Sequence, residues 1–165
     1  MKYIKGDLLK SDQWEIAVQI CNLYHCFGGG IARSIREKFP LVYKADLETK
    51  NGDESKLGTF SYGATNDYRN IFNIYAMYGI GNDSTPLGRN LSYDHLYNAL
   101  YKICKELHTL HKIEIGCPKF LGCARAGGSW PVVEAILGDM ETMFDVEFII
   151  HEFGDETFPQ STLPL

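Results

Sequence analysis

The segment QICNLYHCFGGGIARSI, residues 19–35, decides the fold. It overlaps the short β-branched run of residues 15–21, which predicts a buried strand ending at Cys21. Ile31, Ile35 and Phe39 then recur at four-residue spacing, which predicts a helix over residues 30–39. Three consecutive glycines lie between the two elements. A strand, a glycine turn and a helix in this order are typical of a sheet covered by helices.

The three glycines indicate a ligand site, although a flexible turn accounts for them equally well. Residues without Cβ let the backbone approach a ligand and adopt positive φ. The following helix turns its free N–H groups and positive dipole end to the same space, which suits an anionic or polyhydroxy ligand. The amide of Asn22 can donate to and accept from a pair of ribose hydroxyls. The patterns GxxxxGK[ST] and GxGxxG are both missing, which argues against a Walker loop and a dinucleotide-binding Rossmann fold.

A second glycine-rich loop, FLGCARAGGSWP at residues 120–131, follows a predicted strand that ends near Cys117. Two such loops on neighbouring strands can hold a pyrophosphate from both sides. Ser129 is a preferred N-cap residue for the next helix, and we favour that role over contact with the ligand. Arg125 can reach a phosphate or simply face water.

Short apolar runs alternate with helical patterns along the rest of the chain. This alternation predicts a sheet covered on both faces, which binds ligands beyond the C-terminal ends of its strands. Asn66 and Asp67 indicate a hairpin turn, and Ser92 is a suitable N-cap. The predicted strands cover residues 3–4, 15–21, 57–62, 71–78, 113–117 and 146–153, and the predicted helices cover residues 30–39, 41–50, 92–110 and 131–144.

Composition narrows the class of protein. The 165 residues are expected to form one domain over residues 1–154, followed by a tail at 155–165. A net charge of −5 argues against a nucleic-acid partner, which normally meets a basic face. The five cysteines form no C-x-x-C pair and no zinc spacing, so we expect free thiols in a reducing cytosol and no metal. The sequence shows neither a signal peptide nor a membrane span, which predicts a cytoplasmic protein.

With both loops in place, the chain resembles the macrodomain family from residue 1 to residue 153. KGDLL at residues 5–9 is similar to the family's opening motif, in which an Asp accepts a hydrogen bond from the adenine amino group. Residues 22–32 match the distal-ribose motif, and residues 122–130 resemble the phosphate-binding loop. In the last strand, His151 stands where many members have a ring that stacks on adenine, and Phe153 follows two residues on.

The resemblance implies a three-layer α/β/α sandwich around a mixed, mostly parallel sheet, with ADP-ribose as the ligand. Taken alone, Asp7 is more simply explained as a turn residue. The ligand-binding residues implied are Gly6, Asp7, Leu8, Asn22, Gly28, Gly29, Gly30, Ile31, Gly122, Cys123, Ala124, Arg125, Ala126, Gly127, Gly128, Ser129, Trp130, His151 and Phe153.

YAMYGIG at residues 75–81 resembles the branch that holds ADP-ribose-1″-phosphate phosphatases and terminal ADP-ribose protein glycohydrolases, although it lacks a lysine. Gln19 replaces a His that the phosphatases often carry, and Ala126 and Ser129 replace acids of related members. Asn22 and His25 remain as catalytic candidates, since Asn22 can position a water and His25 suits general acid/base work. The alternative for His25 is an exposed loop residue.

Three functions stay open. We expect a monomer that binds ADP-ribose without a cofactor and hydrolyses a derivative, either ADP-ribose-1″-phosphate or terminal ADP-ribose on a protein. The first alternative is a non-catalytic ADP-ribose reader. The second is a different nucleotide-binding α/β protein.

Overall fold

The centre of the molecule is a six-stranded sheet of order β1-β6-β5-β2-β4-β3. The computed structural model describes residues 1–80, 89–107 and 111–154. Neighbouring strands pair in parallel, except β3 and β4, which form an antiparallel hairpin. The sheet is therefore mixed and mostly parallel, as predicted. Its strands are β1 (Lys2–Lys5), β2 (Ile16–Cys21), β3 (Phe60–Ala64), β4 (Asn70–Tyr75), β5 (Ile113–Pro118) and β6 (Val146–Glu152).

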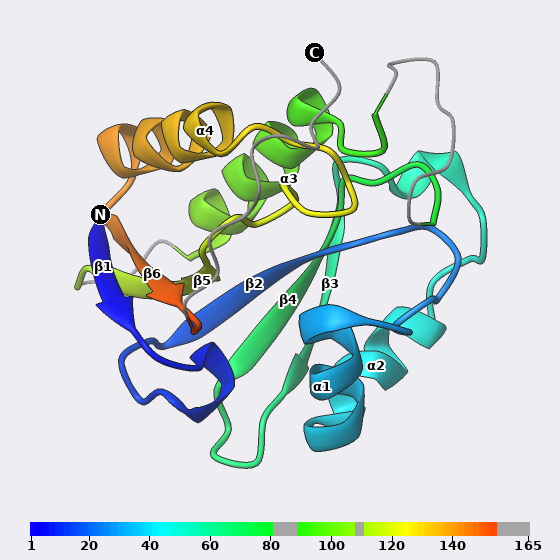
Figure 1. Ribbon diagram of the computed structural model, residues 1–165, viewed down its shortest axis with the longest axis horizontal. Helices are drawn as coiled ribbons and strands as arrows, with labels where there is room; N and C mark the ends of the chain where they lie inside the picture. The colour runs from blue at the N-terminus through cyan, green and yellow to red at the C-terminus, as the bar shows by residue number, and fades with distance from the viewer. Residues whose placement is uncertain (81–88, 108–110, 155–165) are drawn as a thin grey trace.

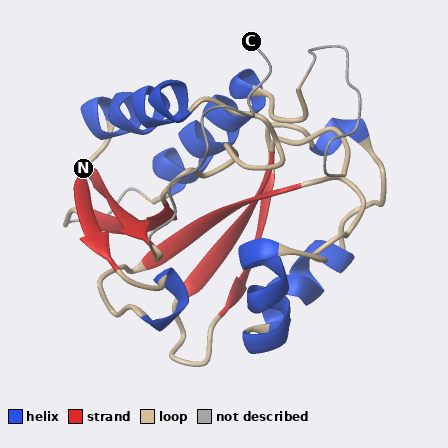
Figure 2. Ribbon diagram, viewed as in Figure 1, coloured by secondary structure: helices blue, strands red, loops and turns tan. Residues whose placement is uncertain are grey.

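Helices cover both faces of the sheet, which confirms the three-layer α/β/α sandwich (Figures 1 and 2). Ala17 and Val18, neighbours in β2, belong to two different apolar clusters, one on each face, as the two-residue period of a strand requires. Among the described residues, none of the helices combines the length and the apolar character that a membrane span requires. One face carries α1 (Gly30–Lys38) and α2 (Pro40–Leu47), and the other carries α3 (Tyr93–Glu106) and α4 (Trp130–Met143).

The predicted elements are present, and their ends differ for local reasons. The strand expected at residues 57–62 begins only at Phe60, because a 3-10 turn, η2 (Glu54–Lys56), and Gly58 at φ +80° precede it. The predicted N-cap is confirmed, since Ser92 Oγ accepts the N–H of His95 at 3.3 Å. Helix α3 ends at Glu106, four residues earlier than expected. Residues 108–110, the tail at 155–165 and most of the polar loop at 82–90 lie outside the described residues.

The order of the strands creates a switch point between β2 and β5, which are neighbours in the sheet. β2 leads into α1 on one face, whereas β5 leads through the second glycine-rich loop into α4 on the other (Figure 1). Chains that diverge in this way leave a crevice beyond the C-terminal ends of the two strands. Both glycine-rich loops follow strands at this edge, where the sequence predicted a ligand site.

Candidate functional site

A cleft of about 1060 Å³ lies at this edge of the sheet. This volume matches the upper range of small-molecule sites in proteins, roughly 300–1,000 Å³. Its walls come from five parts of the chain: the end of β1 with the turn after it, the end of β2 with the first glycine-rich loop and the start of α1, the segment after β4, the end of β5 with the second glycine-rich loop, and the end of β6. Asp7 and all three glycines of the turn, Gly28, Gly29 and Gly30, line this one cleft. The opening motif and the triple-glycine turn therefore share a groove.

Asp7 lies at one end of the cleft, directly after β1. Its Oδ1 accepts the N–H of Leu9 at 2.9 Å and so caps a short 3-10 turn, η1 (Leu8–Lys10). The hydrogen bonds seen among the described residues use only this oxygen of the carboxylate. Asp7 is thus both a turn residue, as the simpler explanation held, and part of the wall, with Oδ2 left to meet a ligand.

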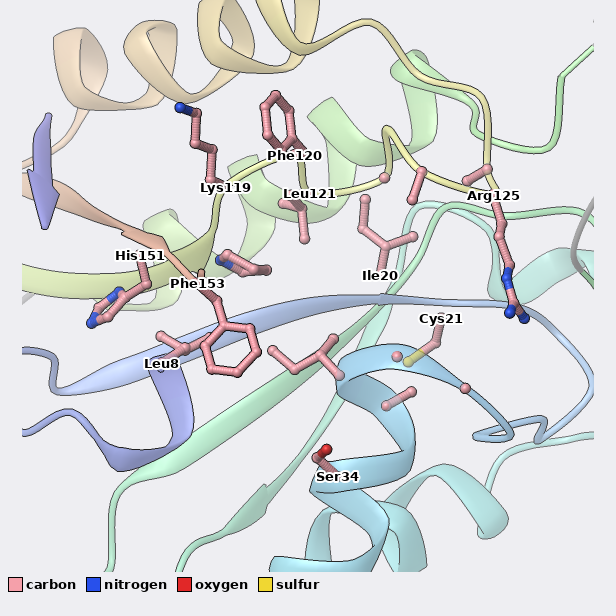
Figure 3. A pocket seen from close by; sticks show the side chains of 18 of the residues that line it. Leu8, Ile20, Cys21, Ser34, Lys119, Phe120, Leu121, Arg125, His151 and Phe153 are labelled. Atoms are coloured by element: carbon pink, nitrogen blue, oxygen red, sulfur yellow. The ribbon is translucent and has the colours of Figure 1, made fainter. Parts of the chain in front are cut away.

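His151 and Phe153 line the same end of the cleft in different ways (Figure 3). His151 is 2% exposed, and its Nδ1–H donates to the carbonyl of Ile149 at 2.9 Å. Burial lowers the pKa of His151 below its usual 6.5, against smaller opposing effects of this hydrogen bond and of Asp7. The ring that is free to stack on a ligand is that of Phe153, which is 61% exposed.

Asn22 lines the cleft, but its amide is largely used within the first loop. Oδ1 accepts the N–H groups of Tyr24 at 2.8 Å and Cys26 at 3.3 Å, and Nδ2 donates to the carbonyl of Cys26 at 3.0 Å. The side chain therefore folds residues 22–26 into a tight turn. One N–H of Nδ2 is left over for a ligand.

His25 is held by a buried carboxylate and is not among the residues that line the cleft. Its Nδ1–H donates to Asp46 Oδ2 at 2.8 Å, and Tyr75 donates to Asp46 Oδ1 at 2.7 Å. The side chains of His25 and Asp46 are 16% and 0% exposed, so the interpretation of His25 as an exposed loop residue is wrong. The loop backbone is unusual at this contact, since His25 has φ +56°, which is uncommon for a non-glycine residue.

Lys56 also holds the first loop in place through hydrogen bonds. Its ammonium donates to the carbonyl of Leu23 and to Thr49 Oγ1, both at 3.0 Å. Burial lowers the pKa of this lysine, and the nearby carboxylate of Asp46 opposes the shift. The first loop is therefore anchored by a buried polar network instead of an apolar contact alone.

The start of α1 is open to the cleft. Gly29 is its N-cap and makes no side-chain cap bond, since it has no side chain. Gly30, the first helical residue, has φ +59°, a left-handed conformation that favours glycine, and a Cβ there would meet nothing within 4 Å. The amides of the first turn are thus unobstructed, which is the arrangement that binds anions at helix N-termini.

The second loop contributes only its first half to the cleft wall. Gly122, Ala124, Arg125 and Ala126 line it. Gly122 has φ +71°, and a Cβ at this position would lie only 2.8 Å from Cδ1 of Ile20. The remaining residues implied by the resemblance do not line the cleft: Cys123, Gly127, Gly128, Ser129 and Trp130, together with Gly6 of the first motif.

Of these residues, Cys123 and Gly128 are buried, and Ser129 and Trp130 form the start of α4. Cys123 is buried in the apolar cluster beneath α3 and α4, and Trp130 packs its ring edge-on against Phe120. Ser129 occupies the N-cap position, as expected, but its hydroxyl makes no cap bond. Its N–H instead donates to the hydroxyl of Tyr93 at 2.8 Å.

Arg125 extends from the second loop across to the first (Figure 3). A Cβ built on Gly29 would lie 3.2 Å from Nη1 of Arg125, so the guanidinium lies directly over the glycine turn. The side chain lines the cleft and is exposed. Arg125 is therefore exposed to water, as one of the two expectations held, but it also lies over the first loop.

Sequence reasoning missed the segment between β5 and Gly122. Lys119, Phe120 and Leu121 all line the cleft; in Figure 3 Leu121 points toward Ile20, whereas Lys119 and Phe120 extend toward α4. Phe120 has φ +64°, so both loops contain a non-glycine residue in the left-handed region. The rule that ligands bind after strand ends would have found these residues, because they follow β5 directly. Gln19, by contrast, is fully buried and donates to Asn73 Oδ1 at 2.8 Å, away from the cleft.

The comparisons with known proteins assign the fold. Models of protein families gave no match, and neither did curated proteins. Among solved structures, a protein of unknown function from Bacteroides thetaiotaomicron is 23% identical, with a TM-score of 0.77, over 92% of this chain and 96% of the other. The macrodomain of Mycobacterium tuberculosis DarG is 21% identical, with a TM-score of 0.68, over 91% and 95%.

A third structure, Thermosipho africanus DarTG in complex with ADP-ribose, is 16% identical, with a TM-score of 0.68, over 98% of this chain and 44% of the other. These likenesses, together with the mostly parallel sheet and its four helices, show that the chain has the macrodomain fold. Within the described ranges, no group of three His, Cys, Asp or Glu side chains is arranged to hold a metal ion.

Proposed function

We propose that this protein binds ADP-ribose in the cleft between the two glycine-rich loops. The observation that carries the proposal is that Asp7 and the triple-glycine turn line the same cleft. One ligand can then meet both a carboxylate that accepts from a purine amino group and a set of free amides that binds a diphosphate. The ADP-ribose complex of the Thermosipho africanus protein, which shares the fold, supports the same ligand.

The wall residues suggest how the ligand lies. Adenine binds between Asp7 Oδ2, which accepts from its amino group, and the exposed ring of Phe153, which stacks on it. The diphosphate meets the open amides at the start of α1 and the backbone of the second loop. The distal ribose then reaches Asn22 and the glycine turn, where the absence of side chains leaves room for it.

Titration calorimetry with ADP-ribose, AMP, NAD and GDP tests the proposal. We expect ADP-ribose to bind more tightly than AMP, because only the longer ligand reaches the glycine turn, and GDP to bind least well. Equal affinity for AMP and ADP-ribose would contradict it, because the contacts of the first loop with the distal ribose would then contribute nothing.

A second candidate function is hydrolysis of an ADP-ribose derivative, either ADP-ribose-1″-phosphate or terminal ADP-ribose on a protein. One observation favours it: the contact with buried Asp46 orients the ring of His25 beside the turn that Asn22 builds, as in a histidine prepared for proton transfer. In phosphate release, water attacks phosphorus and loses a proton, and the bond to the 1″ oxygen breaks as that oxygen gains one.

Release of inorganic phosphate from ADP-ribose-1″-phosphate distinguishes the two candidates. Turnover that His25→Gln abolishes while ADP-ribose affinity is retained supports the hydrolase. Tight binding of the ligand by the unmodified protein without any turnover supports the non-catalytic ADP-ribose reader instead. His25 lies outside the cleft wall, so the geometry supports binding more directly than catalysis.

A further inference from the structure

Arg125 crosses the cleft from the second glycine-rich loop to the first. Its guanidinium lies against the N-cap of α1, because a Cβ built on Gly29 would be 3.2 Å from Nη1, 3.7 Å from Cζ and 3.8 Å from Nη2. Figure 3 shows the side chain extending between the two segments. No backbone hydrogen bond joins residues 22–30 to residues 121–128, both of which the structure describes in full. A side chain, and not the backbone, therefore spans the opening between the loops.

No polar contact with the described part of the chain holds the guanidinium in this position. Arg125 is exposed, and no hydrogen bond or ion pair joins its side chain to a residue that the structure describes. Arg33 of α1, by contrast, pairs with Glu37 at 3.2 Å. The N–H donors of Arg125 are thus available to a ligand, and the side chain can swing aside without breaking a hydrogen bond to a described residue.

The guanidinium lies where positive potential already gathers. Gly29 is the N-cap of α1, so the free amides and the positive dipole end of this helix face the same space. Asp7 and Glu152, the acids of the described cleft wall, follow β1 and end β6, and Figure 3 shows the end of β6 across the cleft from Arg125. A guanidinium beside a positive helix end is repelled unless an anion lies between the two. The diphosphate of the proposed ligand is such an anion.

We propose that Arg125 is a clasp, a side chain that closes over the diphosphate of a bound ligand and slows its release. This inference rests on the proposed binding of ADP-ribose and adds how the bound ligand is retained. The diphosphate takes hydrogen bonds from the amides of α1 on one side and from the guanidinium on the other. The second set is strong, because both partners are charged and a planar guanidinium can donate two parallel bonds to phosphate oxygens.

The dissociation rate of ADP-ribose, measured by surface plasmon resonance, tests the inference. We expect Arg125→Gln to raise this rate about tenfold, as for the loss of one hydrogen bond to a charged group, with a much smaller change in the association rate. Arg125→Lys keeps the charge without the planar fork and should recover part of the difference. The dissociation rate of AMP, which carries one phosphate, should rise less. The melting temperature of the free protein should stay the same, because the side chain has no described partner to lose.

Arg33→Gln is the matched control. It removes the same side chain and the same charge from α1 itself, but Arg33 is not among the residues that line the cleft, and its side chain is 64% exposed. The dissociation rate of ADP-ribose from this variant should equal that from the unmodified protein. A rise as large as in Arg125→Gln would mean that general positive charge near α1, and not a clasp, retains the ligand.

The remaining outcomes separate this inference from the proposed function. An unchanged dissociation rate in Arg125→Gln, with ADP-ribose still bound, refutes the clasp and leaves the proposed function standing. An equal rise for AMP and ADP-ribose also refutes it, because Arg125 would then act on the part that the two ligands share. No binding of ADP-ribose by the unmodified protein refutes the proposed function and the clasp together.

Discussion

The carboxylate of Asp7 caps η1 through one oxygen and offers the other to the cleft. Asp7→Asn separates these roles, because the amide oxygen can still accept from Leu9 while the amide nitrogen cannot accept from adenine. We expect ADP-ribose and AMP to bind roughly 10- to 100-fold more weakly, with unchanged thermal stability, since a buried hydrogen bond to a charged group is lost.

Binding measurements on Asp7→Asn and on Asp12→Asn check this prediction. Asp12 is an exposed neighbour whose carboxylate contacts only Gln13 among the described residues, so its change should have no effect. Unchanged affinity in Asp7→Asn would exclude Asp7 as the adenine-reading residue.

His151 links stability to pH. Because burial lowers its pKa in the folded state, the unfolded chain binds a proton more readily as the pH falls below the ordinary value of 6.5. The stability conferred by the neutral ring is present above that value and is lost as the pH falls through the window beneath it. We therefore expect the fall in melting temperature between pH 7.5 and pH 5.5 to be smaller in His151→Gln than in the unmodified protein. An identical fall in the two proteins would show that His151 does not titrate in this way.

At the scale of elements, the first loop owes its shape to the network around Asp46. Asp46→Ala leaves the hydroxyl of Tyr75 and the ring of His25 without their acceptor in a buried site. We expect a loss of about 3 kcal/mol in the free energy of unfolding, measured by urea denaturation, together with weaker ADP-ribose binding. Asp53→Ala, at the exposed cap of η2, should cost far less. A similar cost for both changes would mean that the network contributes little.

The glycine turn gives the sharpest element-scale test. Gly29 has φ −152°, an extended conformation that any residue adopts, so Gly29→Glu should fold. Its Cβ would approach only the flexible end of Arg125, and its carboxylate can pair with that guanidinium across the cleft. We expect ADP-ribose affinity to fall below detection while the melting temperature stays within a few degrees. Retained affinity in the folded variant would refute the assignment of this loop.

Much of the element order could be predicted from local patterns. The short β-branched run of β2, the helical periodicity of α3 and the turn residues between β3 and β4 predicted the type of each element and the hairpin. The ends were less predictable, because they depend on tertiary contacts. β4 ends at Tyr75, three residues before the apolar run does, where the chain leaves the hairpin and Tyr75 turns its hydroxyl to Asp46.

At the scale of the whole molecule, glycine-rich turns and strand ends were enough to locate the cleft, because parallel strands bring their C-terminal ends to one edge. Sequence spacing could not show which side of each loop faces the ligand. Cys123 turns into the core, whereas Arg125 turns to the first loop. Nor could it reveal the partnership of His25 with Asp46, which are 21 residues apart and meet only through packing of α2.

A crystal structure of the protein soaked with ADP-ribose tests the central claim most directly. The account predicts adenine beside Asp7 and Phe153, the diphosphate on the first turn of α1, and the distal ribose at the turn of Gly28, Gly29 and Gly30. A nucleotide bound elsewhere, or bound with adenine beside Arg125, would contradict it.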